Sequence, residues 1–372
     1  MNDVLQTLAD LVRINSINPS YEGGVGEEEV ARYVEAFFTR RGIETWRQTV
    51  VPGRDNVIAR IPGAQPGRRI ILEAHMDTVS TAGMTIDPFN PVIADGKLYG
   101  RGSCDTKAGL ATMMHALAHL KENGITPACE VWLAAVVDEE YTFLGVRKLC
   151  EEPLHAQAAI VAEPTELRAV TAAKGVLRWR LRTRGVAAHS AKPHLGRNAI
   201  QDMGRVLAAL EEPILTPAHP LLGPATRNVG LIRGGEQINF VPELCEIAID
   251  RRLLPGEDPH AVWAATNARL AELPGLTLEF DPPYLADGPL ETDPTAPAVL
   301  AAQQVLANLG LDPAPTGVPY GSDASKLARA GVPSLIFGPG SIDRAHTAAE
   351  YVECDQVLTA LRFHIGFLCH FR

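Results

Sequence analysis

The chain has 372 residues, of which 46% are hydrophobic and 21% are charged. This length predicts two or three domains, and the composition excludes a disordered or collagen-like chain. A net charge of −10 without a Lys/Arg cluster argues against nucleic acid as a partner. The sequence contains no apolar run of about 18 residues, so no membrane span is predicted.

The N-terminal segment, MNDVLQTLADLVRIN, predicts an amphipathic helix. It lacks the basic start and the apolar run of a signal peptide. The six cysteines are scattered without a CxxC pair, which favours reduced thiols. We therefore expect a cytoplasmic protein.

Short apolar runs predict strands that are buried on both faces, at 69–74, 131–137, 158–162 and 334–337. Helical patterns lie between or beside them, at 27–41, 107–122 and 292–309. This alternation predicts an α/β domain with a mostly parallel sheet, formed by residues 1–171 and 284–372.

The segment 172–283 has a different pattern. Apolar and polar residues alternate over 176–183 and over 244–252, which is typical of antiparallel strands with one solvated face. Residues 198–210 predict a helix. We therefore expect a smaller α+β domain inserted into the α/β domain.

Polar side chains follow the predicted parallel strands where each strand ends. Ligands of open α/β sheets bind at the carboxyl ends of the strands, so these groups are expected at one rim. A loop residue that precedes the helix at 107–122 joins the set. The candidates are His75, Asp77, Asp105, Asp138, Glu139, Glu140, Glu163 and His346.

So many carboxylates in one small site raise each other's pKa unless cations neutralise them. Mixed imidazole and carboxylate ligands suit zinc, cobalt or manganese better than calcium. Any one of these residues, taken alone, is better explained as a helix cap or a surface acid. The set as a whole favours a metal site.

Motifs spread over nearly the whole chain resemble those of the zinc-dependent exopeptidases and deacylases. That family includes acetylornithine deacetylase, succinyl-diaminopimelate desuccinylase, aminoacylase and bacterial glutamate carboxypeptidases. The motifs are His75-Met76-Asp77, Gly100 to Lys107, Asp138-Glu139-Glu140, Glu163-Pro164-Thr165, Gly185 to Ser190, Ile238 to Pro242, and His346 to Glu350.

The resemblance implies two divalent metal ions, with zinc favoured over cobalt or manganese. It implies that one ion is bound by His75 and Glu163, the other by Glu140 and His346, and that Asp105 bridges both. It also implies a cis peptide bond between Asp105 and Thr106. A pair of bridged metals lowers the pKa of a water from 15.7 toward about 7.

The same resemblance makes Glu139 the general base, which takes the proton of that water and passes it to the leaving nitrogen. Asp77 is placed two residues after His75, where it can orient the imidazole. A plain hydrogen bond within the loop is an equally compatible role for Asp77.

Other candidates concern the substrate. The resemblance implies that Asn239 and Arg252 of the inserted domain bind the substrate's α-carboxylate, although Arg252 also fits a surface strand residue beside Asp250. Gly338 and Gly340 are candidates to present backbone N–H groups to a substrate carboxylate, or else they form a plain turn.

The sequence alone favours a role for His189 in a turn, where it would cap the following segment. In the resembling family, lid domains pair edge to edge into a homodimer, and this histidine reaches the partner's active site. There it would stabilise the oxyanion of the tetrahedral intermediate.

These observations predict a two-metal hydrolase that removes the acyl group from N-acyl amino acids, with N-acetylornithine as the first candidate substrate. The alternatives are a carboxypeptidase or dipeptidase of the same family, which acts on short peptides, and a non-catalytic, metal-stabilised binding protein. The intact Glu139 argues against the last alternative, because a pure binding site has no use for a base.

Overall fold

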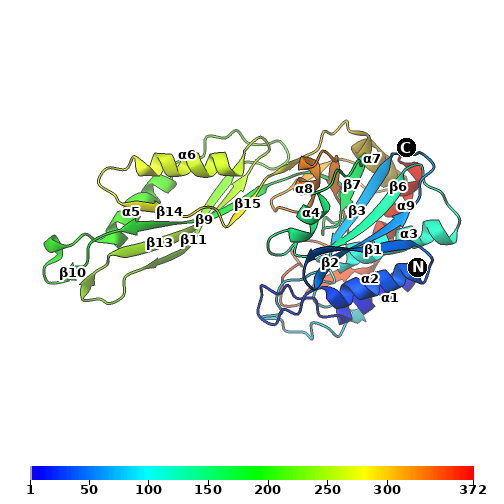
Figure 1. Ribbon diagram of the computed structural model, residues 1–372, viewed down its shortest axis with the longest axis horizontal. Helices are drawn as coiled ribbons and strands as arrows, with labels where there is room; N and C mark the ends of the chain where they lie inside the picture. Colours follow the sequence, from blue (N-terminus) through cyan, green and yellow to red (C-terminus); the bar gives the residue numbers. More distant parts are fainter. Residues whose placement is uncertain (1) are drawn as a thin grey trace. The chain divides into compact units, whose positions relative to one another are not determined.

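The computed structural model of the protein describes residues 2–372 (Figure 1). The chain divides into two compact units. The first unit comprises residues up to 171, together with 291–316 and 322–372, and the second comprises 172–290 and 317–321. Within residues 2–372, no helix has the length and apolar character to cross a membrane.

A nine-stranded sheet forms the centre of the first unit, in the order β1-β2-β6-β3-β7-β18-β8-β16, with β17 beside β8. The strands are β1 (Glu44–Val51), β2 (Arg54–Ile61), β3 (Arg69–His75), β6 (Glu130–Val136), β7 (Ala158–Val161), β8 (Val170–Ala173), β16 (Leu290–Glu291), β17 (Thr316–Val318) and β18 (Ser334–Ile336).

The four central strands of this sheet, β6, β3, β7 and β18, are mutually parallel. They are the four strands expected from the apolar runs, so the α/β fold class predicted from the sequence is confirmed. The β1–β2 hairpin was not predicted, and it extends the sheet by antiparallel pairing of β2 with β6. Because the central strands are parallel, their carboxyl ends lie at one edge.

Helices cover both faces of the sheet, which explains why its central strands are apolar on both sides (Figure 1). One face forms a continuous core with α1 (Asn2–Arg13), α2 (Glu28–Thr39), α3 (Lys107–Glu122), α7 (Pro297–Asn308) and α9 (Cys354–His370). The shorter helices α4 (Leu144–Leu149) and α8 (Ala324–Arg329) lie against the other face. A separate small sheet joins β4 (Val92–Ala94), β5 (Lys97–Tyr99) and β19 (Tyr351–Glu353).

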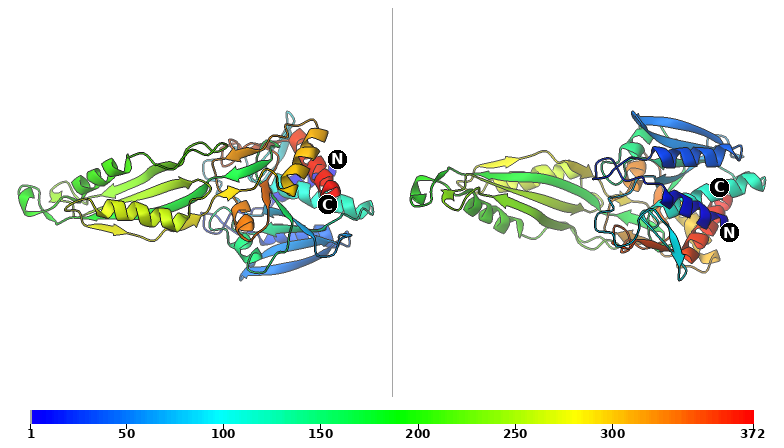
Figure 2. Two further views of the ribbon diagram at one scale, coloured as in Figure 1. Left: turned by 90° about the horizontal axis from the view of Figure 1, so that it is seen from above. Right: turned by 90° about the horizontal axis from the view of Figure 1, so that it is seen from below.

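The second unit is an antiparallel sheet with two helices on one face (Figure 2). Its strands are β9 (Gly175–Arg184), β11 (Thr226–Gly234), β13 (Leu244–Leu253), β14 (Leu278–Phe280) and β15 (Leu285–Asp287), and its helices are α5 (Ala199–Leu210) and α6 (Pro259–Ala271). A short strand pair, β10 (Ala188–His189) with β12 (Phe240–Val241), and a single 3₁₀ turn, η1 (Pro193–Leu195), complete the unit.

The alternation in β9 separates an apolar face from an ionic face. Leu177, Trp179 and Leu181 are fully buried in the core shared with α5 and α6. On the opposite face, Arg178 pairs with Asp250 at 2.7 Å. This is the arrangement that period-two patterning predicts.

The end of the second unit differs from the expected boundary at residue 283. β15 pairs with β9, with Ala286 opposite Leu177, so the unit continues to residue 290. The short segment 317–321 also belongs to it. Sequence patterning missed both, because β15 has only three residues and the segment 317–321 has only five, too few to display a period.

Candidate metal centre

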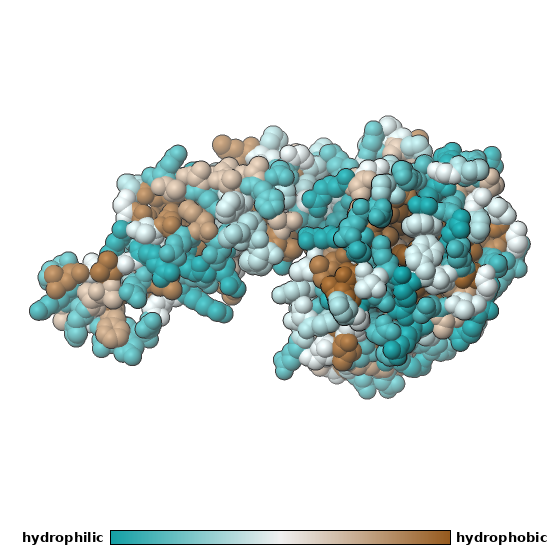
Figure 3. Space-filling view, in the orientation of Figure 1, coloured by the Kyte–Doolittle hydropathy of each residue, from teal (hydrophilic) through white to brown (hydrophobic). Residues whose placement is uncertain are grey.

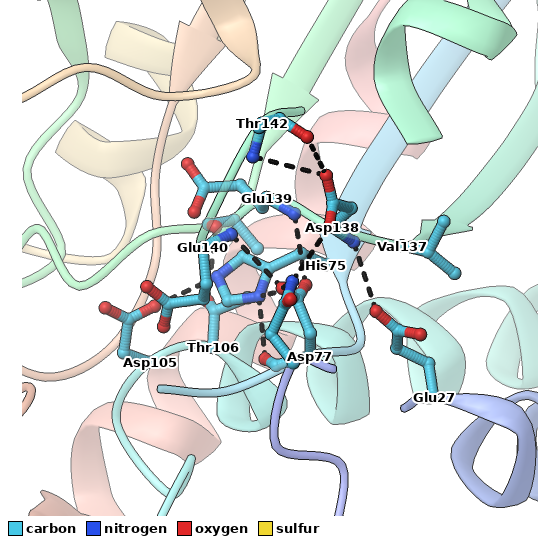
Figure 4. Close-up of polar contacts among 12 residues, drawn as sticks. Glu27, His75, Asp77, Asp105, Thr106, Val137, Asp138, Glu139, Glu140 and Thr142 are labelled. Carbon is cyan, nitrogen blue, oxygen red and sulfur yellow. Dashed lines mark hydrogen bonds and ion pairs between the residues drawn. The ribbon is translucent and has the colours of Figure 1, made fainter. Parts of the chain in front are cut away.

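The predicted metal ligands converge at the carboxyl edge of the parallel strands, and Figure 4 shows three of them, His75, Asp105 and Glu140. His75 is the last residue of β3, and its Nε2 lies 3.0 Å from Asp105 Oδ1. Asp105 comes from the loop before α3, and its Oδ2 lies 3.3 Å from His346 Nε2. Asp105 therefore turns one oxygen toward each histidine, which is the geometry a bridging carboxylate requires.

The acidic residues after β6 and β7 complete the cluster. The ligand atoms of His75, Asp105 and Glu140 all lie within 4.8 Å of one another, and so do those of His75, Glu139 and Glu163. His346 Nε2 is 3.2 Å from Glu140 Oε1. We call His75, Asp105, Glu139, Glu140, Glu163 and His346 the candidate metal cluster.

The loop that carries Asp105 has the backbone form that the resemblance implied: the Asp105–Thr106 peptide bond is cis. The Thr106 hydroxyl donates to the carbonyl oxygen of Ala162, 3.1 Å away, which ties this loop to the strand end before Glu163. The donor set is chemically suited to two cations, because it mixes imidazole nitrogens with carboxylate oxygens.

The charges of the cluster perturb one another strongly. Burial raises the pKa of Glu139 and of Glu163 well above the usual range, and neighbouring carboxylates raise both further. Burial lowers the pKa of His346, but its hydrogen bonds to Asp105 and Glu140 outweigh this and raise it to about 11. Glu139 and Glu163 therefore bind protons more readily than free carboxyl groups, whereas contact with His346 and His75 lowers the pKa of Asp105, and divalent cations would compete with these protons.

Asp77 connects the first ligand to the segment after β6. Its carboxylate is fully buried and accepts the side-chain amide of Asn18 at 2.7 Å. The same carboxylate lies 3.5 Å from His75 Nδ1, while the backbone oxygen of Asp77 lies 3.0 Å from that nitrogen. Asp77 thus lies beside the imidazole of His75 and bonds Asn18 outside its own loop, and its role in orienting a metal ligand stays a prediction.

Asp138 follows the end of β6, as expected for a residue of the rim, but its carboxylate is held by side chains outside the candidate metal cluster. Its buried carboxylate accepts hydrogen bonds from Asn18 at 2.9 Å and from Arg54 Nη2 at 3.0 Å. Arg54 also pairs with the buried carboxylate of Glu27. Asp138 thus belongs to an internal ion network beside the site, whose members lie too far apart in sequence for a motif to reveal.

The expectation that Gly338 and Gly340 offer N–H groups to a substrate is wrong. The N–H of Gly338 donates to Thr165 Oγ1 at 3.1 Å, and that of Gly340 donates to Gln356 Oε1 at 2.8 Å. Gly338 has a packing role instead, because a Cβ there would lie 2.5 Å from the carbonyl oxygen of Glu163.

The remaining candidates belong to the second unit. His189 is exposed, and its Nδ1 accepts the N–H of Ala191 at 3.1 Å. Asn239 is exposed as well. Arg252 Nε donates to Asp250 Oδ1 at 2.8 Å, which is the surface-strand arrangement considered for it from the sequence.

Residues 71–370 match the model of "Peptidase family M20/M25/M40". An acetylornithine deacetylase of Myxococcus xanthus is 30% identical over 358 residues, which cover 91% of each chain.

Solved structures share the fold. An aminopeptidase PepT of Bacillus cereus superposes with a TM-score of 0.84 at 23% identity, covering 100% of this chain and 98% of its own. The YXEP protein of Bacillus subtilis, described as a dinuclear metal-binding peptidase, superposes with a TM-score of 0.75 at 18% identity, covering 99% and 97%.

Proposed function

Because the chain belongs to peptidase family M20/M25/M40, and is therefore a metal-dependent hydrolase of amide bonds, we propose that it uses two metal ions to deacylate N-acyl amino acids. The observation that carries the two-metal part is Asp105, which turns one carboxylate oxygen toward His75 and the other toward His346.

The residues would share the work as follows. His75 and Glu163 would hold one ion, Glu140 and His346 the other, and Asp105 both. The ions, when bound, would lower the pKa of a water molecule and polarise the scissile carbonyl. Zinc suits this donor set best, with cobalt or manganese as alternatives.

Glu139 would act as the base. It is partly buried beside other acids, and both burial and these neighbours raise its pKa, which makes it a stronger proton acceptor than a free carboxylate. It would take the proton from the attacking water and deliver it to the leaving amide nitrogen. Asp77 would keep His75 and the Glu139 segment in place.

N-acetylornithine is the first candidate substrate, because the Myxococcus xanthus relative that aligns over 91% of each chain is an acetylornithine deacetylase. A carboxypeptidase or dipeptidase activity is the second candidate, since peptidases share the fold. A free α-carboxylate on the substrate would suit the guanidinium of Arg252 and the amide of Asn239.

A homodimer through the second unit is part of this proposal. β11 is the outer strand of its sheet, and its Leu231 and Ile232 are 54% and 55% exposed. Apolar side chains also gather at the end of the second unit that holds β10 (Figure 3). Ile238, three residues before Val241 of β12, is fully exposed. An apolar edge strand of this kind is a template for pairing with a second copy.

His189 would contribute to the partner's site in such a dimer. Because its Nδ1 accepts the N–H of Ala191, its proton lies on Nε2, which is then a donor for an oxyanion.

We include a cytoplasmic location in the proposal, because the six cysteines, all between residues 104 and 369, are free thiols.

The test is a substrate panel with defined metal content. The purified chain is loaded with Zn²⁺, Co²⁺ or Mn²⁺ and offered N-acetylornithine, other N-acyl amino acids, and dipeptides with free carboxyl ends. Release of ornithine or another amino acid that stops on chelation and returns with metal supports deacylation. Turnover of dipeptides alone would favour the second candidate, and no turnover on any substrate with metal bound would overturn the proposal.

A further inference from the structure

A buried glutamate outside the candidate metal cluster holds the loop of Asp105. Glu350 is fully buried, and its Oε1 accepts the backbone N–H groups of Cys104 at 2.9 Å and of Asp105 at 3.1 Å. Its own backbone oxygen accepts the N–H of Gly100 at 3.0 Å. Both ends of the segment 100–105 are therefore fixed by this one residue.

The second carboxylate oxygen of Glu350 is bound by Arg101. The distance from Arg101 Nη1 to Oε2 is 2.5 Å, and only 2% of the Arg101 side chain is exposed. Arg101 also donates from Nε to the Ser80 carbonyl at 3.2 Å and from its backbone N–H to the Pro88 carbonyl at 2.9 Å. The ion pair thus joins the loop before α3 to the segment before β19, and the two other hydrogen bonds of Arg101 join it to the loop after β3.

Glu350 also belongs to the segment of the second histidine, four residues after His346. The same segment is held by the N–H of Thr85, which donates to the Ala348 carbonyl at 2.8 Å. His346 itself has a left-handed backbone, with φ of 58°, and its side chain is 48% exposed. Packing therefore does little to fix its position, and the hydrogen bonds of the following residues hold the backbone from which its side chain reaches Asp105 and Glu140.

We propose that Glu350 and Arg101 form a positioning pair for the two-metal site. They would set the distance between Asp105 and His346, and thereby the affinity for metal, without binding metal or substrate themselves. This inference rests on the proposed function for the identity of the ligands. Glu350 and Arg101 themselves lie outside the ligand set of the proposed function.

The hydrogen bonds of Glu350 require both the charge and the shape of a carboxylate at this position. Oε1 accepts two N–H groups and Oε2 accepts the guanidinium, so every contact of the carboxylate is a hydrogen bond that it accepts. In Glu350→Gln, the amide NH₂ would face either the guanidinium or the two N–H groups, and donors would meet donors. The loop would shift to avoid this, and Asp105 would move with it.

The experiment compares metal affinity with stability. Zn²⁺ affinity is measured by competition with a chromophoric chelator for the full chain and for Glu350→Gln, Arg101→Met and Arg101→Lys, and thermal midpoints are measured without metal. We expect Glu350→Gln and Arg101→Met to bind Zn²⁺ about 10- to 100-fold more weakly, the usual effect of losing a residue that orients a ligand. Arg101→Lys, which keeps the charge, should recover part of the loss.

Glu257→Gln is the matched control. Glu257 in the second unit also pairs with a buried arginine, Arg251, at 2.7 Å and accepts a backbone N–H, that of Leu254, at 2.7 Å. It should lose thermal stability and keep its Zn²⁺ affinity.

The proposal is overturned if Glu350→Gln behaves like this control, with a lower midpoint and Zn²⁺ affinity within twofold of the parent. If Glu350→Gln does not fold, unchanged affinity in both Arg101 variants overturns it equally. Because Zn²⁺ binding is measured without substrate, a failure of the proposed reaction would leave this result intact.

Discussion

The carboxylate of Asp77 accepts a hydrogen bond from the backbone N–H of Glu139, with 3.1 Å between Oδ1 and the nitrogen. Its other oxygen accepts the N–H of Glu140 at 3.2 Å. Since Oδ1 also lies 3.5 Å from His75 Nδ1, one buried side chain fixes a proposed ligand and the segment of the proposed base. The Asp77 of the HxD motif therefore connects the end of β3 to the segment that follows β6.

Asp77→Asn tests this connection. The asparagine amide would direct an NH₂ donor at a backbone N–H or at the imidazole, so the Glu139 segment would shift. We expect kcat on the best substrate of the panel to fall about 10- to 100-fold, while the chain stays folded. Asp87→Asn is the control, because Asp87 is an exposed acid of the same unit that accepts the N–H of Phe89 at 3.2 Å. Equal kcat in both variants and the parent would contradict the role of Asp77.

Glu139→Ala separates a base from a ligand. Ligand atoms of His75, Glu139 and Glu163 lie within 4.8 Å of one another, so geometry alone would allow Glu139 to bind metal. If Glu139 is a base and not a ligand, its replacement by alanine should lower kcat by about 10²- to 10⁴-fold and leave two metal ions bound per chain. Metal content after dialysis is the measurement, with Glu163→Gln as the comparison that should lose an ion. Loss of metal from Glu139→Ala would make it a ligand instead.

The central sheet and the acidic rim were predictable for one physical reason. Parallel strands with helices on both faces are apolar throughout, so their ends stand out where polar residues begin, as at His75 and Glu163. Strand β1 has no such contrast, because none of its residues is fully buried and its composition is mixed. The hairpin that it forms with β2 was accordingly missed.

The contacts that hold the site in place could not be predicted in the same way. Arg54 meets Asp138 across 84 residues, and Arg101 meets Glu350 across 249. A single sequence has no local pattern that links such positions. The Gly338 error has the same origin, because the acceptor of its N–H, Thr165, is 173 residues away.

His364 provides a test of stability against pH. It is fully buried in α9 beside the rings of Phe337 and Phe363, and neither ring nitrogen has a hydrogen-bond partner within residues 2–372. Burial lowers its pKa to about 3. In the unfolded chain the pKa of this histidine is about 6.5. Below pH 6.5 the unfolded state therefore binds a proton that the folded state does not bind, and the free energy of unfolding falls.

His364→Phe keeps an aromatic ring in the core and removes this titration. From pH 7.5 to pH 5, the free energy of unfolding should fall by about 2 kcal/mol less in the variant than in the parent, since one pKa unit corresponds to about 1.4 kcal/mol. Urea denaturation at the two pH values measures the difference. His260→Phe, at an exposed position of α6, should follow the parent, and parallel curves for His364→Phe would contradict the prediction.

The proposed contribution of His189 to a partner's site predicts complementation. His189→Ala and Glu139→Ala should each be nearly inactive, the first by about 10²- to 10³-fold for the loss of one oxyanion donor. A mixed dimer has one site with an intact Glu139 and an intact His189 from the other copy. Random exchange makes half of the dimers mixed, with one working site of two, so about a quarter of the parent activity should return.

Mixing Glu139→Ala with Glu163→Gln is the matched control for that experiment. Both residues belong to the candidate metal cluster of a single chain, so each copy in a mixed dimer carries a damaged site and no activity should return. Subunit exchange is followed by native mass spectrometry of tagged copies. If exchange is complete and the His189→Ala mixture stays as inactive as this control, His189 does not act across the dimer. A mixture in which only monomers are found would reject the dimer as well.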